Sequence, residues 1–149
     1  MILVTGGAGV MGSRLVRALC KEGRRIRVLT LPNDPGLDRL KDLNCQIVHA
    51  DVRDRASLAG VCDGVTCVFH LAAVIIAHDP EVFEAVNVAG TSNILHESIN
   101  AGVRHFIFVS SIPVTYPVHT PYSISKAKCE RMISSQDKLQ WTIVRPTLA

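Results

Sequence analysis

Short runs of β-branched and other apolar residues recur along the chain, and stretches with helical spacing separate most of them. We expect six strands, over residues 2–4, 26–30, 46–48, 67–71, 105–109 and 142–144. Continuous apolar strands are typical of a sheet that is covered on both faces, so the pattern predicts an α/β fold with a parallel sheet. Right-handed crossovers then favour a doubly wound sheet with Rossmann strand order and helices on both faces.

The helical segments are expected over residues 10–22, 80–100 and 121 to about 137. Gly23 follows the first segment and is a helix-ending residue. Gly90 lies inside the longest segment, where it permits close packing against another element. No internal repeat, low-complexity tract or linker divides residues 1–149, so we expect one domain.

A glycine-rich segment joins the first predicted strand to the first predicted helix. It reads Thr5-Gly6-Gly7-Ala8-Gly9-Val10-Met11-Gly12. In such a loop Gly6 or Gly7 permits the tight turn, Gly9 lets the backbone approach a diphosphate, and Gly12 permits close packing of helix and strand. The diphosphate would lie at the positive end of the helix. Because Ser13 follows where a phosphate-binding P-loop has Lys, the segment disfavours an ATPase or GTPase.

Composition adds exclusions. The chain has 48% hydrophobic and 19% charged residues, and its net charge of +3 is spread along the sequence, which gives little support for nucleic-acid binding. Its five cysteines form no C-x-x-C pair, so we expect a reduced, cytoplasmic protein. The six histidines show no metal-ligand spacing, and no apolar run is long enough to span a membrane. We therefore expect neither a metal site nor a membrane segment.

Several motifs stand in one order along the chain. After the glycine loop come Asp51-Val52, His70-Leu71-Ala72-Ala73, Asn87-Val88-Ala89-Gly90-Thr91, Val109-Ser110-Ser111, Tyr122-Ser123-Ile124-Ser125-Lys126 and Arg145-Pro146. This order resembles the extended short-chain dehydrogenases/reductases of the NAD-dependent epimerase/dehydratase type, over essentially all of the chain. The resemblance implies an NAD(P)-binding Rossmann domain. The cofactor-binding positions that it implies are Gly6, Gly9, Val10, Met11, Gly12, Asp34, Asp51, Val52, Leu71, Ala72, Ala73, Asn87, Tyr122, Lys126 and Pro146.

The chemistry expected from Tyr122 and Lys126 follows from their spacing. Four residues apart on a helix, the two side chains lie on one face, and a nearby ammonium lowers the pKa of a tyrosine toward a value useful for proton transfer. The resemblance implies a catalytic triad of Ser111, Tyr122 and Lys126, with Lys126 also orienting the nicotinamide ribose. Ser110 is an alternative to Ser111. Asn87 and Arg145 each have a purely structural interpretation, in helix packing and in an ion pair.

Three features depart from the family pattern. Thr30 ends the second strand where a ribose-binding acidic residue is expected, and Asp34 follows four positions later; since no arginine follows directly, NAD is favoured over NADP. The connection from Ser111 to Tyr122 is short for the family, either because this member is abbreviated or because residues are missing. The sequence ends at Ala149, where the family continues into a substrate-binding region.

Three functions compete at this stage. The leading hypothesis is an NAD(P)-dependent oxidoreductase or epimerase acting on a nucleotide sugar. The second is a ketone or alcohol reductase of the steroid or flavonoid type. The third is a non-catalytic dinucleotide-binding module. The resemblance also implies a homodimer, formed through the long helix and the helix that carries Tyr122.

Overall fold

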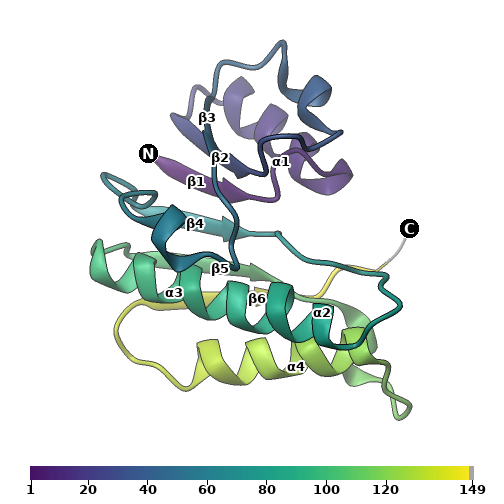
Figure 1. Ribbon diagram of the computed structural model, residues 1–149. Helices are drawn as coiled ribbons and strands as arrows, with labels where there is room; N and C mark the ends of the chain where they lie inside the picture. Colours follow the sequence, from purple (N-terminus) through teal and green to yellow (C-terminus); the bar gives the residue numbers. More distant parts are fainter. Residues whose placement is uncertain (148–149) are drawn as a thin grey trace.

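The computed structural model describes residues 1–147 and shows a six-stranded parallel sheet with helices on both faces (Figure 1). The strand order is β3-β2-β1-β4-β5-β6, and every pairing is parallel. The strands are β1 (Ile2–Thr5), β2 (Ile26–Thr30), β3 (Gln46–His49), β4 (Cys67–His70), β5 (His105–Val109) and β6 (Gln140–Val144). The predicted fold class and Rossmann order are confirmed.

Helices on the two faces bury two separate cores. Helix α1 (Val10–Lys21) packs on one face over a cluster that includes Val4 and Val28, and helices α3 (Gly90–Asn100) and α4 (Pro121–Ser134) lie side by side on the other (Figure 1). The second cluster includes Phe106 and Phe108 of β5, which are fully buried. Because strand side chains alternate between faces, strands β1, β2 and β4 each contribute to both cores, as their continuous apolar runs predict.

The long helix differs from the single regular segment expected over 80–100. It begins as α2 (Glu81–Phe83), continues through a π-helical stretch, η3 (Glu84–Ala89), and becomes α3. Gly90 starts α3, and a Cβ atom there would lie 2.7 Å from Val52 Cγ2, so the expected close packing is confirmed. π-Helical turns frequently mark functional positions.

The remaining connections contain short 3₁₀ turns, η1 (Leu37–Leu40), η2 (Arg55–Leu58) and η4 (Ile112–Thr115). Strand boundaries agree with the sequence pattern to within two residues, the largest difference being the earlier start of β6 at Gln140. Helix α4 ends at Ser134, three residues before the expected end. The carboxyl ends of all the strands meet at one edge of the sheet, and the order changes direction between β1 and β4, the usual ligand position in such sheets.

Candidate functional site

The glycine loop after β1 is a tight cradle that only backbone fits. Gly6 has φ +67°, so it is the residue that makes the turn. A Cβ on Gly6 would lie 2.8 Å from Ala72 N, and one on Gly12 would lie 2.2 Å from Gly6 O. Gly9 is the N-cap of helix α1, and it provides no side-chain cap; the first turn of the helix contains no acidic residue. Its positive end is therefore left for an anionic ligand.

Asp34, which follows the end of β2 by four residues, folds back so that its carboxylate lies beside Thr30. Asp34 N–H donates to Leu31 O at 3.3 Å, which closes a turn. The Asp34 carboxylate accepts hydrogen bonds from Thr30 Oγ1 at 3.1 Å and from Gly36 N–H at 2.8 Å. The folded chain thus has a carboxylate beside the last residue of β2, although the sequence places Thr30 there.

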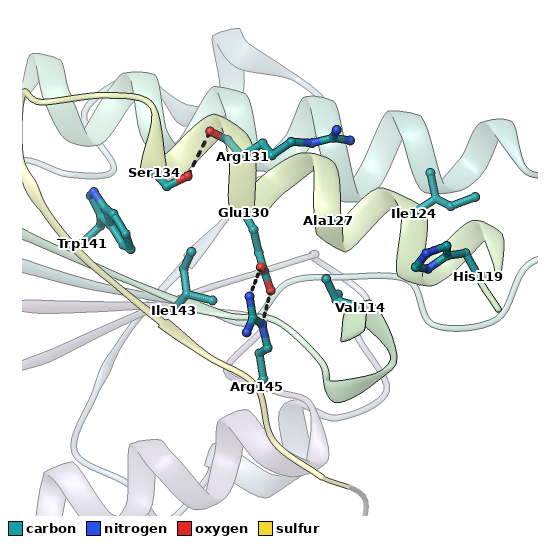
Figure 2. A pocket seen from close by; sticks show the side chains of 10 residues that line it. All are labelled: Val114, His119, Ile124, Ala127, Glu130, Arg131, Ser134, Trp141, Ile143 and Arg145. Carbon is teal, nitrogen blue, oxygen red and sulfur yellow. Dashed lines mark hydrogen bonds and ion pairs between the residues drawn. The ribbon is translucent and has the colours of Figure 1, made fainter. Parts of the chain in front are cut away.

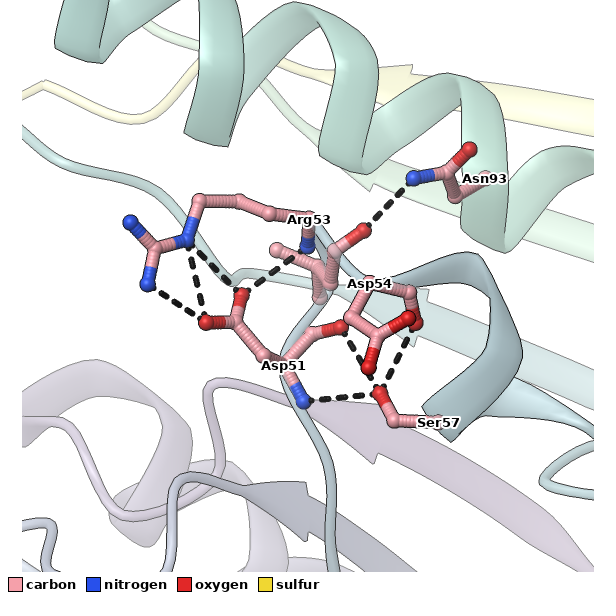
Figure 3. A network of polar contacts seen from close by, with 6 residues as sticks. Asp51, Arg53, Asp54, Ser57 and Asn93 are labelled. Carbon is pink, nitrogen blue, oxygen red and sulfur yellow. Dashed lines mark hydrogen bonds and ion pairs between the residues drawn. The ribbon is translucent and has the colours of Figure 1, made fainter.

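Asp51 is held by its neighbour Arg53 (Figure 3). The guanidinium donates to both carboxylate oxygens, at 2.6–3.0 Å, and this contact holds the pKa of Asp51 below its usual value despite partial burial. Asn93 of α3 donates to Val52 O at 2.8 Å. Asp51 and Val52 therefore form a fixed wall that is attached to the long helix.

The segment after β4 is fixed to both sides of the site. Leu71 N–H donates to Thr5 O at 3.2 Å, and Ala72 N–H donates to Thr5 Oγ1 at 3.2 Å. Further on, Val74 N–H donates to Asn87 Oδ1 at 2.8 Å. The predicted segment Leu71–Ala73 thus runs from the glycine loop to the π-helical stretch.

Asn87 is buried, and its side chain bonds to protein partners. Besides accepting from Val74 N–H, it donates from Nδ2 to Val74 O at 3.0 Å and to Ser125 Oγ at 2.9 Å. Asn87 therefore has a structural role, as considered above: its side chain joins the segment after β4 to α4. The packing role of Ser125 was not anticipated, although its place between Tyr122 and Lys126 could have suggested it.

The two serines after β5 have different surroundings. Ser110 is buried and donates from Oγ to Glu130 Oε1 at 2.6 Å, so its hydroxyl is engaged by α4. Ser111 is half-buried, and its side chain lies close enough to Tyr122 to lower the pKa of the phenol. Of the two serines, Ser111 is therefore the one that faces Tyr122, whereas the Ser110 hydroxyl is bonded to Glu130.

The electrostatics of Tyr122 differ from the expectation. Burial raises the pKa of Tyr122, and the contact with Ser111 only partly opposes this. Lys126 is almost fully buried with Nζ 4.2 Å from the centre of the Phe108 ring, and burial lowers its pKa to about 8. The expected lowering of the Tyr122 pKa by Lys126 is therefore wrong for this arrangement, because burial of the phenol dominates and the opposing contact comes from Ser111, not from Lys126.

Arg145 has the structural role considered for it. Its guanidinium donates to Glu130 at 2.9 Å and 2.6 Å, which attaches the end of β6 to α4. Burial opposes ionisation of Glu130, but the bonds from Arg145 and Ser110 outweigh it and lower the pKa of Glu130. Figure 2 shows this pair among the side chains that line a groove between α4 and β6. The groove has a volume of about 660 Å³. None of the predicted catalytic residues lines that groove.

Residues 1–147 contain no cluster of three or more His, Cys, Asp or Glu side chains placed to hold a metal ion. Over the same residues, every helix is too short or too polar to cross a membrane.

Three features define a Rossmann domain of the dinucleotide-binding class: the strand order, the tightly packed glycine loop after β1, and the start of α1, which has no side-chain cap and is called the open start below. Residues 3–141 match the model of the 3-beta hydroxysteroid dehydrogenase/isomerase family, and the chain belongs to this family, within the extended short-chain dehydrogenases/reductases.

Relatives of known activity include steroid and lipid enzymes. The chain is 30% identical to a 3 beta-hydroxysteroid dehydrogenase/Delta 5-->4-isomerase of Mycobacterium tuberculosis, over 98% of this chain and 46% of the relative. It is 34% identical to a ceramide reductase of Caulobacter vibrioides, over 98% and 45%. A UDP-glucose 4-epimerase of Thermus thermophilus, solved in complex with NAD, superposes with TM-score 0.84 and 27% identity over 97% and 54%. The chain spans about half the length of these relatives.

Proposed function

We propose that this chain is the NAD(P)-binding part of an oxidoreductase or epimerase that acts through Ser111, Tyr122 and Lys126. The observation that carries the proposal is the open start of α1 at the same sheet edge as Ser111 and the start of α4. Gly6 and Gly12 allow the loop backbone to pack tightly on itself and on Ala72. The first turn of α1, with Gly9, Val10 and Met11, would receive a diphosphate. Asp51, Val52, Leu71, Ala72, Ala73 and Pro146 would line the rest of the cofactor.

The proposed chemistry is proton transfer at a substrate oxygen coupled to hydride transfer at the adjoining carbon. A bound nicotinamide cofactor supplies the hydride donor or acceptor. In the direction of oxidation, the phenolate of Tyr122 removes the proton of the substrate hydroxyl, and in reduction the phenol returns it. Ser111 donates a hydrogen bond to the same oxygen. Lys126, whose Nζ lies against the Phe108 ring in the ligand-free chain, would orient the nicotinamide ribose.

NAD is the preferred cofactor in this proposal. The Asp34 carboxylate lies beside Thr30 at the end of β2, where it would accept hydrogen bonds from ribose hydroxyls and repel a 2′-phosphate. Arg39 donates from Nη1 to Ala8 O at 2.9 Å, so it already binds the glycine loop. The balance of these two side chains decides between NAD and NADP.

A calorimetric titration of the chain with NAD, NADH, NADP and NADPH tests the cofactor proposal. We expect saturable binding, tighter for the NAD pair, and loss of that preference in Asp34→Asn. The matched control is Asp38→Asn, because Asp38 is exposed and its ion pair is with the neighbouring Lys41. Tighter binding of NADPH would assign the 2′-phosphate to Arg39, and absence of binding by the folded chain would contradict the proposal.

For the substrate, one observation favours the steroid- or lipid-type alternative over a nucleotide sugar. Ile75, Ile76, Tyr116 and Val118 belong to the two segments that follow β4 and β5, and they are 50–90% exposed. Val74 bonds to Asn87, which bonds to Ser125, so the first of these segments lies next to the helix of Tyr122. An apolar substrate would cover these side chains.

Separate titrations with two ligands distinguish the two substrate classes. A 3β-hydroxysteroid and UDP-glucose are each titrated into the NADH-saturated chain. We expect the steroid to bind, and binding to weaken in Ile76→Asp; Val10→Asp, at the other end of the site, would affect NADH instead. Binding of UDP-glucose alone would restore the nucleotide-sugar hypothesis.

The proposed homodimer would use the outer side of the long helix and α4. A groove of about 680 Å³ lies there, lined mainly by small and apolar side chains, among them Ala85, Val88, Ala89 and Met132. Light scattering after gel filtration is expected to give twice the mass of the chain, and Ala89→Arg to give the monomer mass.

A further inference from the structure

We infer that His70 is a positioning residue that holds the glycine loop with one ring nitrogen and the helices beside Lys126 with the other. His70 ends β4 and is completely buried. Its Nδ1 lies 2.7 Å from Thr5 Oγ1, and its Nε2 lies 2.9 Å from Thr91 Oγ1. The part of the inference that concerns Thr5 and the glycine loop, its loop side, rests on the proposed dinucleotide site. The part that concerns Thr91 and the helices, its helix side, rests only on the geometry of the ligand-free chain.

On the loop side, Thr5 carries the effect of His70 to the cofactor cradle. Thr5 is the last residue of β1, and Gly6 follows it. Because Thr5 Oγ1 also accepts from Ala72 N–H, its own proton is available to His70 Nδ1. Gly6 and Ala72 pack closely, because a Cβ on Gly6 would lie only 2.8 Å from Ala72 N. A displacement of Thr5 would therefore disturb both the glycine loop and the segment after β4.

On the helix side, Thr91 carries the effect to α4. With Nδ1 accepting, Nε2–H donates to Thr91 Oγ1 on α3. Cys129 Sγ, on α4 and three residues after Lys126, lies 3.5 Å from the same oxygen. The four side chains Thr5, His70, Thr91 and Cys129 form a buried polar row from β1 to α4.

The ring of His70 also supports the surface on which Lys126 rests. His70 and Phe108 stack at 25° with centroids 5.9 Å apart, and Lys126 Nζ lies 4.2 Å from the Phe108 centroid. Burial, with a smaller contribution from the Lys126 charge, lowers the pKa of His70 to about 3. The imidazole is therefore neutral at physiological pH, as its one acceptor and one donor nitrogen require.

Two amide substitutions separate the two bonds. The Asn side chain places its polar atom near the position of Nδ1, whereas the Gln side chain reaches the position of Nε2. His70→Asn should keep the contact with Thr5 and lose that with Thr91, and His70→Gln should do the reverse. Thr91→Val removes only the helix-side partner, and Thr91→Ser, which retains the hydroxyl, is its conservative control.

Two measurements are made on each variant: the dissociation constant for NADH and the NMR titration midpoint of Lys126 in the ligand-free chain. We expect His70→Gln to bind NADH about tenfold more weakly with little change at Lys126. His70→Asn and Thr91→Val should raise the Lys126 midpoint by about one unit, because loosening of the Phe108 contact admits water, while NADH binding changes less than about threefold. Thr91→Ser should match the wild type.

Equal effects of His70→Asn and His70→Gln on both measurements would overturn the inference, since a general packing role does not distinguish the two nitrogens. An unchanged Lys126 midpoint in both His70→Asn and Thr91→Val would also overturn it. If the wild-type chain binds no dinucleotide, the proposed function fails, and the Lys126 titration still decides the helix side of the inference.

Discussion

Helices α1 and α4 both begin near the carboxyl edge of the sheet, but their first turns are completed in opposite ways. At the start of α4, Thr120 and Ser123 form a full capping box, with Thr120 Oγ1 accepting from Ser123 N–H at 3.1 Å and Ser123 Oγ from Thr120 N–H at 2.9 Å. At the start of α1, Gly9 offers no side chain. One start is capped by protein side chains, and the other has no side-chain cap and is where the proposed function places the diphosphate.

The difference separates two tasks within one site. The capped start of α4 fixes the first turn, which carries Tyr122, and the proposed proton transfer requires Tyr122 and Lys126 to hold one geometry. The open start leaves its positive end to an anion, at the cost of stability in the ligand-free chain. The predictions below disturb each task separately.

The largest effect is expected for Tyr122→Phe. Removal of the hydroxyl should lower turnover of a 3β-hydroxysteroid with NAD by at least about 10²- to 10⁴-fold, the usual contribution of a general acid or base. NADH affinity should change less than about twofold. Tyr116→Phe is the matched control, because it removes a tyrosine hydroxyl but keeps the exposed ring that the proposed substrate would cover. Unchanged turnover in Tyr122→Phe would exclude the proton-transfer role.

Acid stability tests the buried polar row that runs from β1 through His70 to α4. His70 has a pKa of about 3 in the folded chain, against 6.5 for an ordinary imidazole. Between pH 6.5 and pH 3, His70 is therefore protonated in the unfolded chain and neutral in the folded chain. Stability from this residue is therefore complete above pH 6.5 and is lost as pH falls toward 3, by roughly 4 kcal/mol. Urea unfolding of the wild type and His70→Asn from pH 7 to pH 4 should show this slope in the wild type alone.

Gly12→Ala should break the open start. A Cβ at Gly12 would lie 2.2 Å from Gly6 O and 2.8 Å from Gly7 Cα, so the loop must move. We expect NADH affinity to fall on the order of 100-fold, a typical cost of displacing a positioned binding group. Gly64→Ala is the control, because Gly64 has φ +70° but open space around it; it should cost about 1 kcal/mol of stability and leave NADH binding intact.

Gly9→Asp should convert the open start into a closed one. A carboxylate at the N-cap would stabilise the ligand-free chain by about 0.5–1 kcal/mol and would repel a diphosphate. We expect NADH to bind about tenfold more weakly while the melting temperature rises. A rise in both stability and affinity would show that the first turn of α1 does not bind the diphosphate.

Thr120→Ala should open the closed start and have the smallest effect. Loss of the cap should cost about 1 kcal/mol in urea unfolding. NADH affinity should stay within about twofold, because the cap lies in α4 and the diphosphate is assigned to α1. A large loss of affinity would remove the contrast between the two helices.

The sequence pattern anticipates the elements better than their interactions. Apolar runs and Gly23 predict the strands and the end of α1, because burial and a left-handed glycine depend on local sequence. The π-helical stretch around Asn87 was not predicted, since a period of 3.6 residues does not reveal one inserted residue. The bonds from Asn87 to Val74 and Ser125 depend on this stretch.

The candidate site shows the same limit. The spacing of Tyr122 and Lys126 places them on one helix, but their pKa values depend on burial against Phe108 and on Ser111, which spacing does not reveal. Asp34 stands four residues after the end of β2 in the sequence, but the turn between Leu31 and Asp34 brings its carboxylate within hydrogen-bonding distance of Thr30. Residues that are separated along the chain meet only through tertiary packing.

The most direct measurement of the central claim is an amide NMR titration of the chain with NADH. The account predicts that the N–H signals of Val10, Met11 and Gly12 shift first and most strongly, while those of Ser123 and Ile124 in the capped turn of α4 move little. Equal shifts at both helix starts, or saturable binding that leaves the α1 signals unmoved, would contradict it.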